Sequence, residues 1–345
     1  MVSSDGRVGF GIIGLGIGLS RCEMLQEAPE ARLVAVSDLV KDKARATAEK
    51  FGADWYTDYH KMLERPDIDV VGVYTPSGLH RDIALDVAKA GKHVLTTKPM
   101  EISFERADAI IDGCKKAGVK LATEFAVRYS PYNYALYRAI NDGKFGKMVL
   151  AQFDYKCYRD QAYYESNGGW RGTWKIDGGG AIMNQTIHSV DQMLWLMGDV
   201  DTVTAKCGTY THTIETEDTG VALLTFKSGA MGTLVGTTTF HNDRPFKNYG
   251  GGVTQRVEMN GEHGSVTLID NKTAMWKFAG ADSDVPSQLQ PPAVNIFQDY
   301  ARWILDDSYS SPTLAKAEEA RKTLGLVLAV YESARTGGTV TLPLA

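Results

Sequence analysis

The chain has 345 residues, of which 43% are hydrophobic and 23% charged, enough for two domains with full hydrophobic cores. Its 37 basic and 42 acidic residues leave a net charge of −5, so no basic surplus favours a nucleic-acid partner. The four cysteines are far apart and form no Cys-x-x-Cys pair, which is typical of reduced thiols rather than a disulfide framework or a zinc site. No apolar run is long enough to span a membrane and the N-terminus does not resemble a secretory signal, so we expect a cytoplasmic protein.

The first third of the chain alternates short apolar runs with amphipathic stretches. The runs cover residues 8–14, 31–38, 69–76, 92–99 and 119–126, and the helical stretches between them include 41–51, 79–91 and 103–118. Near-continuously apolar strands separated by helices are typical of a parallel sheet covered on both faces, and Gly91 and Gly118 stand where helices end. We predict an α/β fold with a doubly wound Rossmann domain over residues 1–126.

The rest of the chain has a different rhythm. A strong helix is predicted near 180–197, followed by strand-like runs at 203–213, 220–229, 230–240, 253–261 and 265–269, several of them joined by turn sequences. A final helix near 313–336 and a short strand at 338–343 close the chain. This pattern predicts a second, α+β domain over residues 127–345, built on a mainly antiparallel sheet.

A glycine-rich turn follows the first predicted strand. Gly14, Gly16, Ile17 and Gly18 lead from that strand into a helix, where main-chain N–H groups and the helix dipole suit a pyrophosphate. The spacing departs from Gly-x-Gly-x-x-Gly, so a turn that only packs a strand on a helix is the alternative.

Asp38 ends the second predicted strand, at the position of an acidic residue that binds ribose hydroxyls; a helix N-cap is the alternative. A carboxylate there favours NAD over NADP, although Lys41, Lys43 and Arg45 leave a phosphate contact possible.

Two further strand ends carry polar residues. Thr75 and Pro76 follow one strand and precede His80, and Lys98 follows the next. In open α/β sheets ligands bind outside the carboxyl ends of the strands, so Thr75, Pro76, His80 and Lys98 are candidate cofactor residues. Lys98 is also a candidate catalytic or substrate-anchoring residue, with a solvated surface lysine as the alternative, whereas His80 is expected to pack or cap near the cofactor.

Taken together, these segments resemble the Gfo/Idh/MocA family of nicotinamide-dependent oxidoreductases, over nearly the whole chain. The resemblance also rests on Lys98-Pro99, on Arg128-Tyr129-Ser130-Pro131, on Trp170-Arg171-Gly172-Thr173-Trp174 and on the pattern Asn184-x-x-x-His188-x-x-Asp191 after three glycines. It implies a C-terminal domain with an open sheet that makes a homo-oligomer, a dimer or tetramer. Two positions depart from the family: Thr97 stands where glutamate is usual, and Asn184 where many members have aspartate.

Within this resemblance, His188 is the candidate catalytic acid/base, because an imidazole titrates near neutral pH. Lys98 would stabilise the developing alkoxide. On a regular helix Asn184, His188 and Asp191 would share one face. Asn184 can orient a hydroxyl but cannot take a proton, and Asp191 either holds the histidine tautomer or is a surface carboxylate. Arg128, Tyr155, Arg171 and Lys175 are candidate substrate or cofactor contacts, with surface pairing or packing as the alternative for each.

The leading functional hypothesis is an NAD-dependent oxidoreductase acting on a secondary hydroxyl or keto carbon of a sugar, sugar derivative or cyclic polyol. A second hypothesis is an enzyme that retains its NAD tightly and recycles it within each turnover, as a glycosidase or internal oxidoreductase does. A third is a dinucleotide-dependent sensor without catalysis. No metal is expected, because only His188 and Asp191 have a ligand-like spacing. No membrane or nucleic-acid partner is expected either.

Overall fold

The computed structural model describes residues 6–243, 251–280 and 286–344, which form two compact units. The first unit contains the chain up to Tyr129 together with residues 292–321, and the second contains residues 130–291 and 322 onward. The division expected from the sequence was 1–126 and 127–345. It assigned residues 292–321 to the second domain, whereas the structure packs them with the first.

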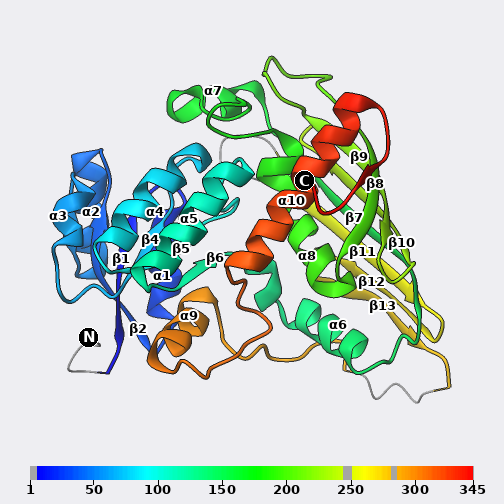
Figure 1. Cartoon of the computed structure of the whole chain (residues 1–345), viewed down its shortest axis with the longest axis horizontal. Coiled ribbons are helices and arrows are strands. Elements are labelled where there is room, and N and C mark those ends of the chain that lie inside the picture. Colours follow the sequence, from blue (N-terminus) through cyan, green and yellow to red (C-terminus); the bar gives the residue numbers. More distant parts are fainter. Residues whose placement is uncertain (1–5, 244–250, 281–285, 345) are drawn as a thin grey trace. The chain divides into compact units, whose positions relative to one another are not determined.

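The first unit is built on a six-stranded parallel sheet of order β3-β2-β1-β4-β5-β6, with helices on both faces (Figure 1). Its strands are β1 Val8–Ile13, β2 Ala31–Ser37, β3 Asp54–Tyr56, β4 Val70–Val73, β5 His93–Thr96 and β6 Leu121–Thr123. The doubly wound fold is confirmed, and every residue of β1 and β4 is buried. Strand β3 was not predicted, because it is an edge strand of three residues with no buried side chain and therefore no apolar pattern.

The helices predicted at 41–51, 79–91 and 103–118, and the one after the glycine turn, are all present, and two further helices, at 59–63 and 296–305, were not predicted. The helices of the first unit are α1 Gly18–Gln26, α2 Lys41–Phe51, α3 Tyr59–Leu63, α4 His80–Lys89, α5 Phe104–Ala117 and α9 Ile296–Leu305, with 3₁₀ turns at Ser77–Leu79 and Ala126–Tyr129. Gly118 ends α5 in the left-handed region, at a φ of 68°, where glycine lacks the Cβ penalty of other residues. The Ser103 hydroxyl accepts a hydrogen bond from the Arg106 N–H at the start of α5.

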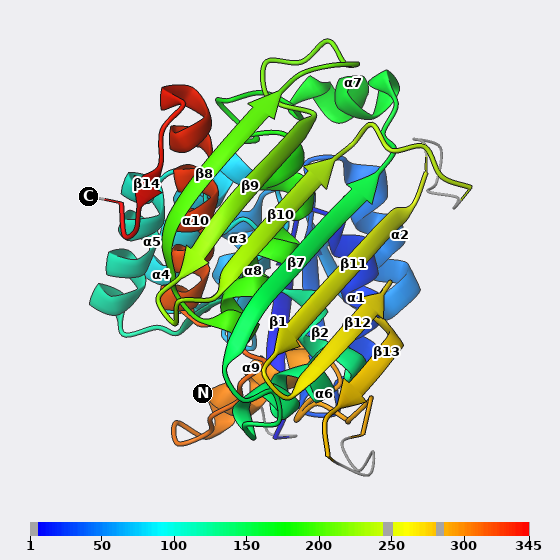
Figure 2. The same cartoon turned by 90° about the vertical axis from the view of Figure 1, so that its right-hand side faces the viewer.

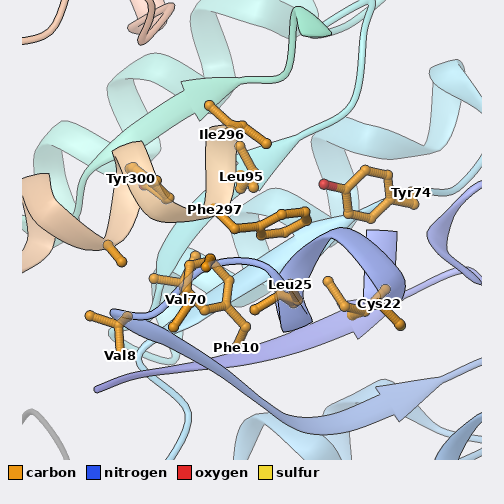
Figure 3. Packing of buried hydrophobic residues seen from close by; sticks show 14 of the residues in the cluster. Val8, Phe10, Cys22, Leu25, Val70, Tyr74, Leu95, Ile296, Phe297 and Tyr300 are labelled. Atoms are coloured by element: carbon orange, nitrogen blue, oxygen red, sulfur yellow. The ribbon is translucent and has the colours of Figure 1, made fainter. Parts of the chain in front are cut away.

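Helix α9 packs into the core of the first unit although it lies far along the chain (Figure 3). The Phe297 ring meets the Phe10 ring edge to face, with centroids 5.5 Å apart. The buried Tyr300 hydroxyl donates to the carbonyls of Val94 at 2.9 Å and Lys120 at 2.7 Å. These contacts explain why residues 292–321 belong to the first unit, since α9 buries its aromatic face against the β1 strand and the main chain of β5.

The second unit is built on an eight-stranded sheet of order β13-β12-β11-β7-β10-β9-β8-β14 (Figure 2). Its strands are β7 Met148–Cys157, β8 Val200–Gly208, β9 Thr219–Phe226, β10 Met231–Thr237, β11 Val253–Gly261, β12 Gly264–Ile269, β13 Lys272–Phe278 and β14 Val340–Thr341. All neighbouring pairs are antiparallel except β7 with β10, so the expected mainly antiparallel sheet is confirmed. The long central strand β7 was not among the predicted strands.

The helices of the second unit are α6 Pro131–Asn141, α7 Gln161–Gly169, α8 Ile187–Met197 and the greater part of α10 Ala317–Thr336. A regular helix was predicted from residue 180 to 197, but its first turn, Ala181–Thr186, is a π-helix and α8 follows it directly. Helix α8 lies behind the sheet in Figure 2, and no helix in the described part of the chain crosses the face turned to the viewer. No helix within the described ranges is long and apolar enough to cross a bilayer.

Candidate active site

One side of the glycine turn between β1 and α1 packs closely against the end of β4. Gly14 has a φ of 87°, and a Cβ there would lie 2.7 Å from the Tyr74 carbonyl oxygen and 3.1 Å from the Thr75 methyl group, so only glycine fits. A Cβ on Gly16 would meet nothing within 4 Å. Helix α1 begins at Gly18 without a side-chain cap, so its first N–H groups and its dipole suit an anionic group.

Asp38 joins the end of β2 to this glycine turn. Its carboxylate accepts hydrogen bonds from the Leu15 N–H at 2.8 Å and the Val40 N–H at 2.9 Å, and pairs with the Lys43 ammonium at 3.1 Å. Burial by itself would raise the pKa of Asp38, but these donors outweigh it and hold that pKa below its usual value. An ionised Asp38 therefore stands beside the turn. The N-cap of α2 is Val40, so the N-cap reading of Asp38 is wrong.

His80 is fully buried and connects the two strand ends that carry Thr75 and Lys98. Its Nε2 lies 2.9 Å from the Thr75 carbonyl oxygen, and its Nδ1 lies 3.0 Å from that of Pro99 and 3.2 Å from that of Met100. Lys98 is half-buried and immediately precedes this anchored segment. His80 thus links the main chain directly after the candidate lysine to the end of β4, while its own ring is buried.

In the second unit, Asn184 is bound to a buried carboxylate that the sequence analysis did not select. The Asn184 amide donates to Asp177 Oδ1 at 2.6 Å, and the other carboxylate oxygen of Asp177 accepts from the Gly172 N–H at 2.9 Å. The Asn184 oxygen in turn accepts from the Gln185 amide at 2.8 Å. Asn184 therefore lies against a carboxylate contributed by the residue just before the triple glycine.

His188 is half-buried near the start of α8 and packs against β7. Its ring stacks on the Tyr155 ring with centroids 6.2 Å apart and planes 26° from parallel. Burial raises the pKa of Tyr155 to a value that keeps its hydroxyl protonated at neutral pH. Asp191, one turn further on, is completely buried and accepts a hydrogen bond from Thr323 at 3.3 Å. The expectation of Asp191 as a surface carboxylate is wrong, because α8 turns this residue inward toward α10.

The other candidate contacts lie in different surroundings. Arg171 stacks over the rings of Tyr163 and Trp170, at 4.6 and 4.8 Å, and donates to Ser166. Arg128 belongs to the first unit, where it is buried and paired with Glu319 at 2.9 Å. Lys175 is exposed. Of these three, Arg171 alone is grouped with other aromatic and polar residues of the candidate site.

Three further residues lie around Asn184, none of them singled out from the sequence, although two belong to the aromatic and charged stretch 155–164 that was expected to shape the substrate site. Gln185 donates to the Tyr163 hydroxyl at 2.9 Å, and Arg159, a fully buried side chain, donates to Gln185 at 3.2 Å. Arg159 also lies 5.4 Å from the centre of the Tyr163 ring. Gln185 was detectable as the neighbour of Asn184, but no local signal links Arg159 or Tyr163 to it, because β7, α7 and the π turn meet only in the folded unit.

A glycine turn followed by an acidic residue at the end of the second strand, on a doubly wound sheet, is the arrangement typical of dinucleotide-binding domains. Residues 8–125 match the model of the oxidoreductase family with an NAD-binding Rossmann fold, and residues 134–267 match the GFO/IDH/MocA C-terminal domain. The chain belongs to the Gfo/Idh/MocA family of oxidoreductases.

Similar proteins support this membership. Myo-inositol 2-dehydrogenase of Thermotoga maritima is 31% identical over 281 residues, covering 76% of this chain and 75% of the relative. D-apiose dehydrogenase of Paraburkholderia graminis is 27% identical over 90% of this chain and 83% of its own length. The crystal structure of the WlbA dehydrogenase from Bordetella pertussis, in complex with NADH and UDP-GlcNAcA, has a TM-score of 0.86 and 31% identity, covering 98% of this chain and all of that one.

Proposed function

We propose that this protein is an NAD-dependent dehydrogenase or reductase that transfers a hydride between nicotinamide and a secondary hydroxyl or keto carbon of a sugar, sugar derivative or cyclic polyol. The observation that carries the proposal is the group around His188: a half-buried imidazole stacked on Tyr155, on the helix whose preceding turn holds Asn184 against the Asp177 carboxylate. The polyol and sugar substrates named for relatives give the substrate class.

The residues of the first unit fit a dinucleotide. Gly14, Gly16, Ile17 and Gly18 would hold the pyrophosphate, and Asp38 the ribose hydroxyls, with Thr75, Pro76 and Lys98 at the adjoining strand ends. The enclosed ring of His80 supports an indirect role through the main chain of Thr75 and Pro99. When bound, the dinucleotide supplies the hydride acceptor or donor.

Side chains of the protein carry out the proton transfer to and from the substrate hydroxyl. In the oxidation direction, the neutral imidazole of His188 accepts the proton of the substrate hydroxyl, and in reduction the imidazolium returns it. Asn184, fixed by Asp177, orients a neighbouring hydroxyl. The Lys98 ammonium stabilises the alkoxide that develops as the proton leaves. Tyr155 and Arg171 are the proposed substrate contacts, because both lie with the His188–Asn184 group or its aromatic neighbours.

A panel of inositols, aldoses and sugar acids with NAD tests the activity, followed through NADH absorbance. We expect His188→Ala to lower kcat/KM by about 10²–10⁴ and Lys98→Ala by about 10²–10³. Two exposed residues, His263 and Lys116, provide alanine controls that keep full activity. If His188→Ala retains wild-type activity on a true substrate, the proposed chemistry is wrong.

The same panel separates the alternatives. Cleavage or isomerisation of a sugar without accumulated NADH would indicate a retained, internally recycled cofactor. Tight NAD binding with no turnover of any panel member would indicate a sensor. Stoichiometric NADH production excludes both.

The preference for NAD over NADP rests on Asp38. A 2′-phosphate beside an ionised carboxylate is repelled, and the nearest cation, Lys43, is already paired with that carboxylate. Comparing kcat/KM for NAD and NADP tests this preference directly, and a preference for NADP would contradict it.

We also propose that the protein is a homo-oligomer assembled through the open face of the second unit's sheet. Three apolar side chains are exposed there on β9 and β10, namely Val221, Leu223 and Met231, and Leu223 is 62% exposed. In Figure 2 no helix of the described residues covers these strands. Light scattering should report a dimer or tetramer that Leu223→Glu dissociates, whereas Leu305→Glu, another exposed leucine, should not. A monomeric wild type would refute the assembly.

A cytoplasmic location is proposed from the cysteines. Cys22, Cys114 and Cys207 are free thiols in the structure, as is typical of proteins in a reducing compartment. Cell fractionation tests the location.

A further inference from the structure

The turn that carries Asn184 begins in an unusual way. Residues Ala181–Thr186 form a π-helix, in which the Thr186 hydroxyl donates to the Ala181 carbonyl at 2.9 Å. π-Helical turns are less stable than α-helical ones and persist where other contacts hold them. Because this turn leads directly into α8, its geometry fixes where Asn184 and His188 lie on the helix.

Glu217, at the approach to β9, supplies one such contact from a buried position. Its two carboxylate oxygens accept hydrogen bonds from the Gly180 N–H at 3.1 Å and the Ile182 N–H at 2.8 Å. Its main-chain carbonyl accepts from the Ala181 N–H at 2.9 Å. Three consecutive N–H groups at the start of the turn are therefore bound by one residue.

Tyr331, on α10, completes this arrangement. Its hydroxyl donates to a Glu217 carboxylate oxygen at 2.9 Å and accepts from the Met183 N–H at 3.1 Å. The fourth N–H of the turn is thereby bound as well. We refer to Glu217 and Tyr331 as the carboxylate–phenol pair; both residues lie in the second unit.

The glycines before the turn make room for this pair. A Cβ on Gly180 would lie 1.8 Å from the Glu217 carbonyl oxygen, and one on Gly179 would lie 2.1 Å from the Tyr331 hydroxyl. Neither position tolerates a side chain without moving the pair or the turn. The sequence analysis used the glycines at 179 and 180 only as part of a family motif. In this chain a side chain at either position would collide with Tyr331 or Glu217, which explains why both are glycine.

We propose that Glu217 and Tyr331 are positioning residues for the reaction step at His188: the carboxylate–phenol pair holds the π-helical turn and so sets the position of Asn184 against Asp177 and of His188 against Tyr155. This inference rests on the proposed function of His188. Neither residue is assigned a contact with substrate. Without the pair, the turn relaxes toward α-helical hydrogen bonding and the two polar side chains rotate out of register.

The first test uses Tyr331→Phe, which removes one hydroxyl and keeps the ring, and Glu217→Gln, which keeps the shape of the side chain. We expect each to lower kcat about tenfold while KM for NAD changes less than twofold, because the dinucleotide contacts lie in the first unit. Tyr309→Phe is the matched control, since it breaks a phenol–carboxylate bond of 2.8 Å to Asp299 in the first unit. Glu262→Gln is the control for an exposed glutamate.

The second test does not depend on activity. Hydrogen–deuterium exchange of the peptide covering residues 180–190 should be faster in Tyr331→Phe and Glu217→Gln than in wild type, and unchanged in both controls. Unchanged exchange, or kcat within twofold of wild type, overturns the inference. If Glu217→Gln does not fold, Tyr331→Phe decides alone.

The two proposals fail in different ways. If His188→Ala is inactive but both pair variants have full activity, the positioning role is wrong and the proposed function stands. If His188→Ala itself is fully active, the proposed function is wrong, and the positioning role falls with it whatever the exchange shows.

Discussion

Each unit uses one buried titratable side chain to hold the main chain beside a candidate catalytic residue, and the two do so with opposite chemistry. In the first unit, the ring nitrogens of His80 face the carbonyl oxygens of Thr75, at the end of β4, and of Pro99, the residue after Lys98. In the second unit, the Glu217 carboxylate faces N–H groups at the start of the helix that carries His188. A strand-to-loop junction presents carbonyls and a helix start presents N–H donors, so the fold dictates which kind of side chain can satisfy them.

Burial shifts the pKa values of His80 and Glu217 in opposite directions. Burial lowers the pKa of His80, although the surrounding carbonyls and the Glu101 carboxylate oppose this. Burial raises the pKa of Glu217 to about 7, although the N–H donors and the Tyr331 hydroxyl oppose it. Its other titratable neighbours are Tyr331 and the thiol of Cys207. Both groups therefore favour their neutral forms, and their contributions to stability change with pH in opposite directions.

The largest expected effect comes from filling the space against the carboxylate–phenol pair. Gly180→Ala would place a methyl group 1.8 Å from a main-chain oxygen, so we expect a loss of roughly 3–4 kcal/mol of stability, about 10 °C in Tm. Gly338→Ala is the control, because its Cβ would meet only the Thr336 hydroxyl at 3.8 Å. Equal melting temperatures for the two variants would show that the turn is not tightly held.

The second prediction concerns pH and Glu217. Because its folded pKa is near 7 and its usual value is 4.5, the folded state binds more protons between these values, so stability from this group is full below about pH 4.5 and is lost as pH rises through 7. The total change is at most about 3 kcal/mol. In denaturant titrations from pH 4.5 to 8, Glu217→Gln should lack this falling component. Parallel pH curves for the variant and wild type would contradict the raised pKa.

Removing His80 tests the other half of the comparison. A neutral imidazole has one N–H, so His80→Leu removes the donor from one of the carbonyls that the ring faces, Thr75 or Pro99, and we expect a loss of about 2 kcal/mol. The sign of the pH effect is reversed: a lowered pKa means that stability from His80 is present above about 6.5 and is lost as pH falls below that value. Denaturation curves at pH 5 and 8 should therefore differ less for the variant than for wild type. If the variant is as stable as wild type, His80 does not stabilise the main chain at Thr75 and Pro99.

The smallest expected effect is a change in KM for NAD, and it distinguishes the role of the first unit from that of the second. Asp38→Ala removes the carboxylate beside the glycine turn, and we expect KM for NAD to rise about tenfold with kcat unchanged. The pair variants should do the opposite, lowering kcat with KM for NAD unchanged. Steady-state kinetics with both substrates varied measures kcat and KM for NAD. A fall in kcat for Asp38→Ala would contradict the expectation that this residue acts only in cofactor binding.

Local sequence patterns were sufficient wherever a structural feature depends on neighbouring residues. The strands and helices from β1 to β6 followed from apolar runs and glycine stops, except for β3 and α3, which are only three and five residues long. The predicted helix at 180–197 was correct from residue 187 onward. Its π-helical start was not predictable, because the contacts that hold it come from Glu217 and Tyr331, more than 30 residues away.

The same limit applied to the candidate site. Gly14, Asp38, Lys98, Asn184 and His188 were found from motifs and from a family resemblance. Asp177, directly before the triple glycine, was not selected, since its bond to Asn184 depends on the path of the intervening chain. Arg159, Tyr163 and Glu217 carry no motif at all.

The sequence by itself determined the class of fold, the family and the residues with the chemistry to bind a dinucleotide and move a proton, because these depend on residue type and spacing. The tertiary structure decided which sheet α9 covers, that the carboxylate beside position 184 comes from Asp177, and that a buried acid and phenol hold the helix of His188. These features arise from contacts between segments far apart in the chain, and such contacts leave no periodic trace in the sequence.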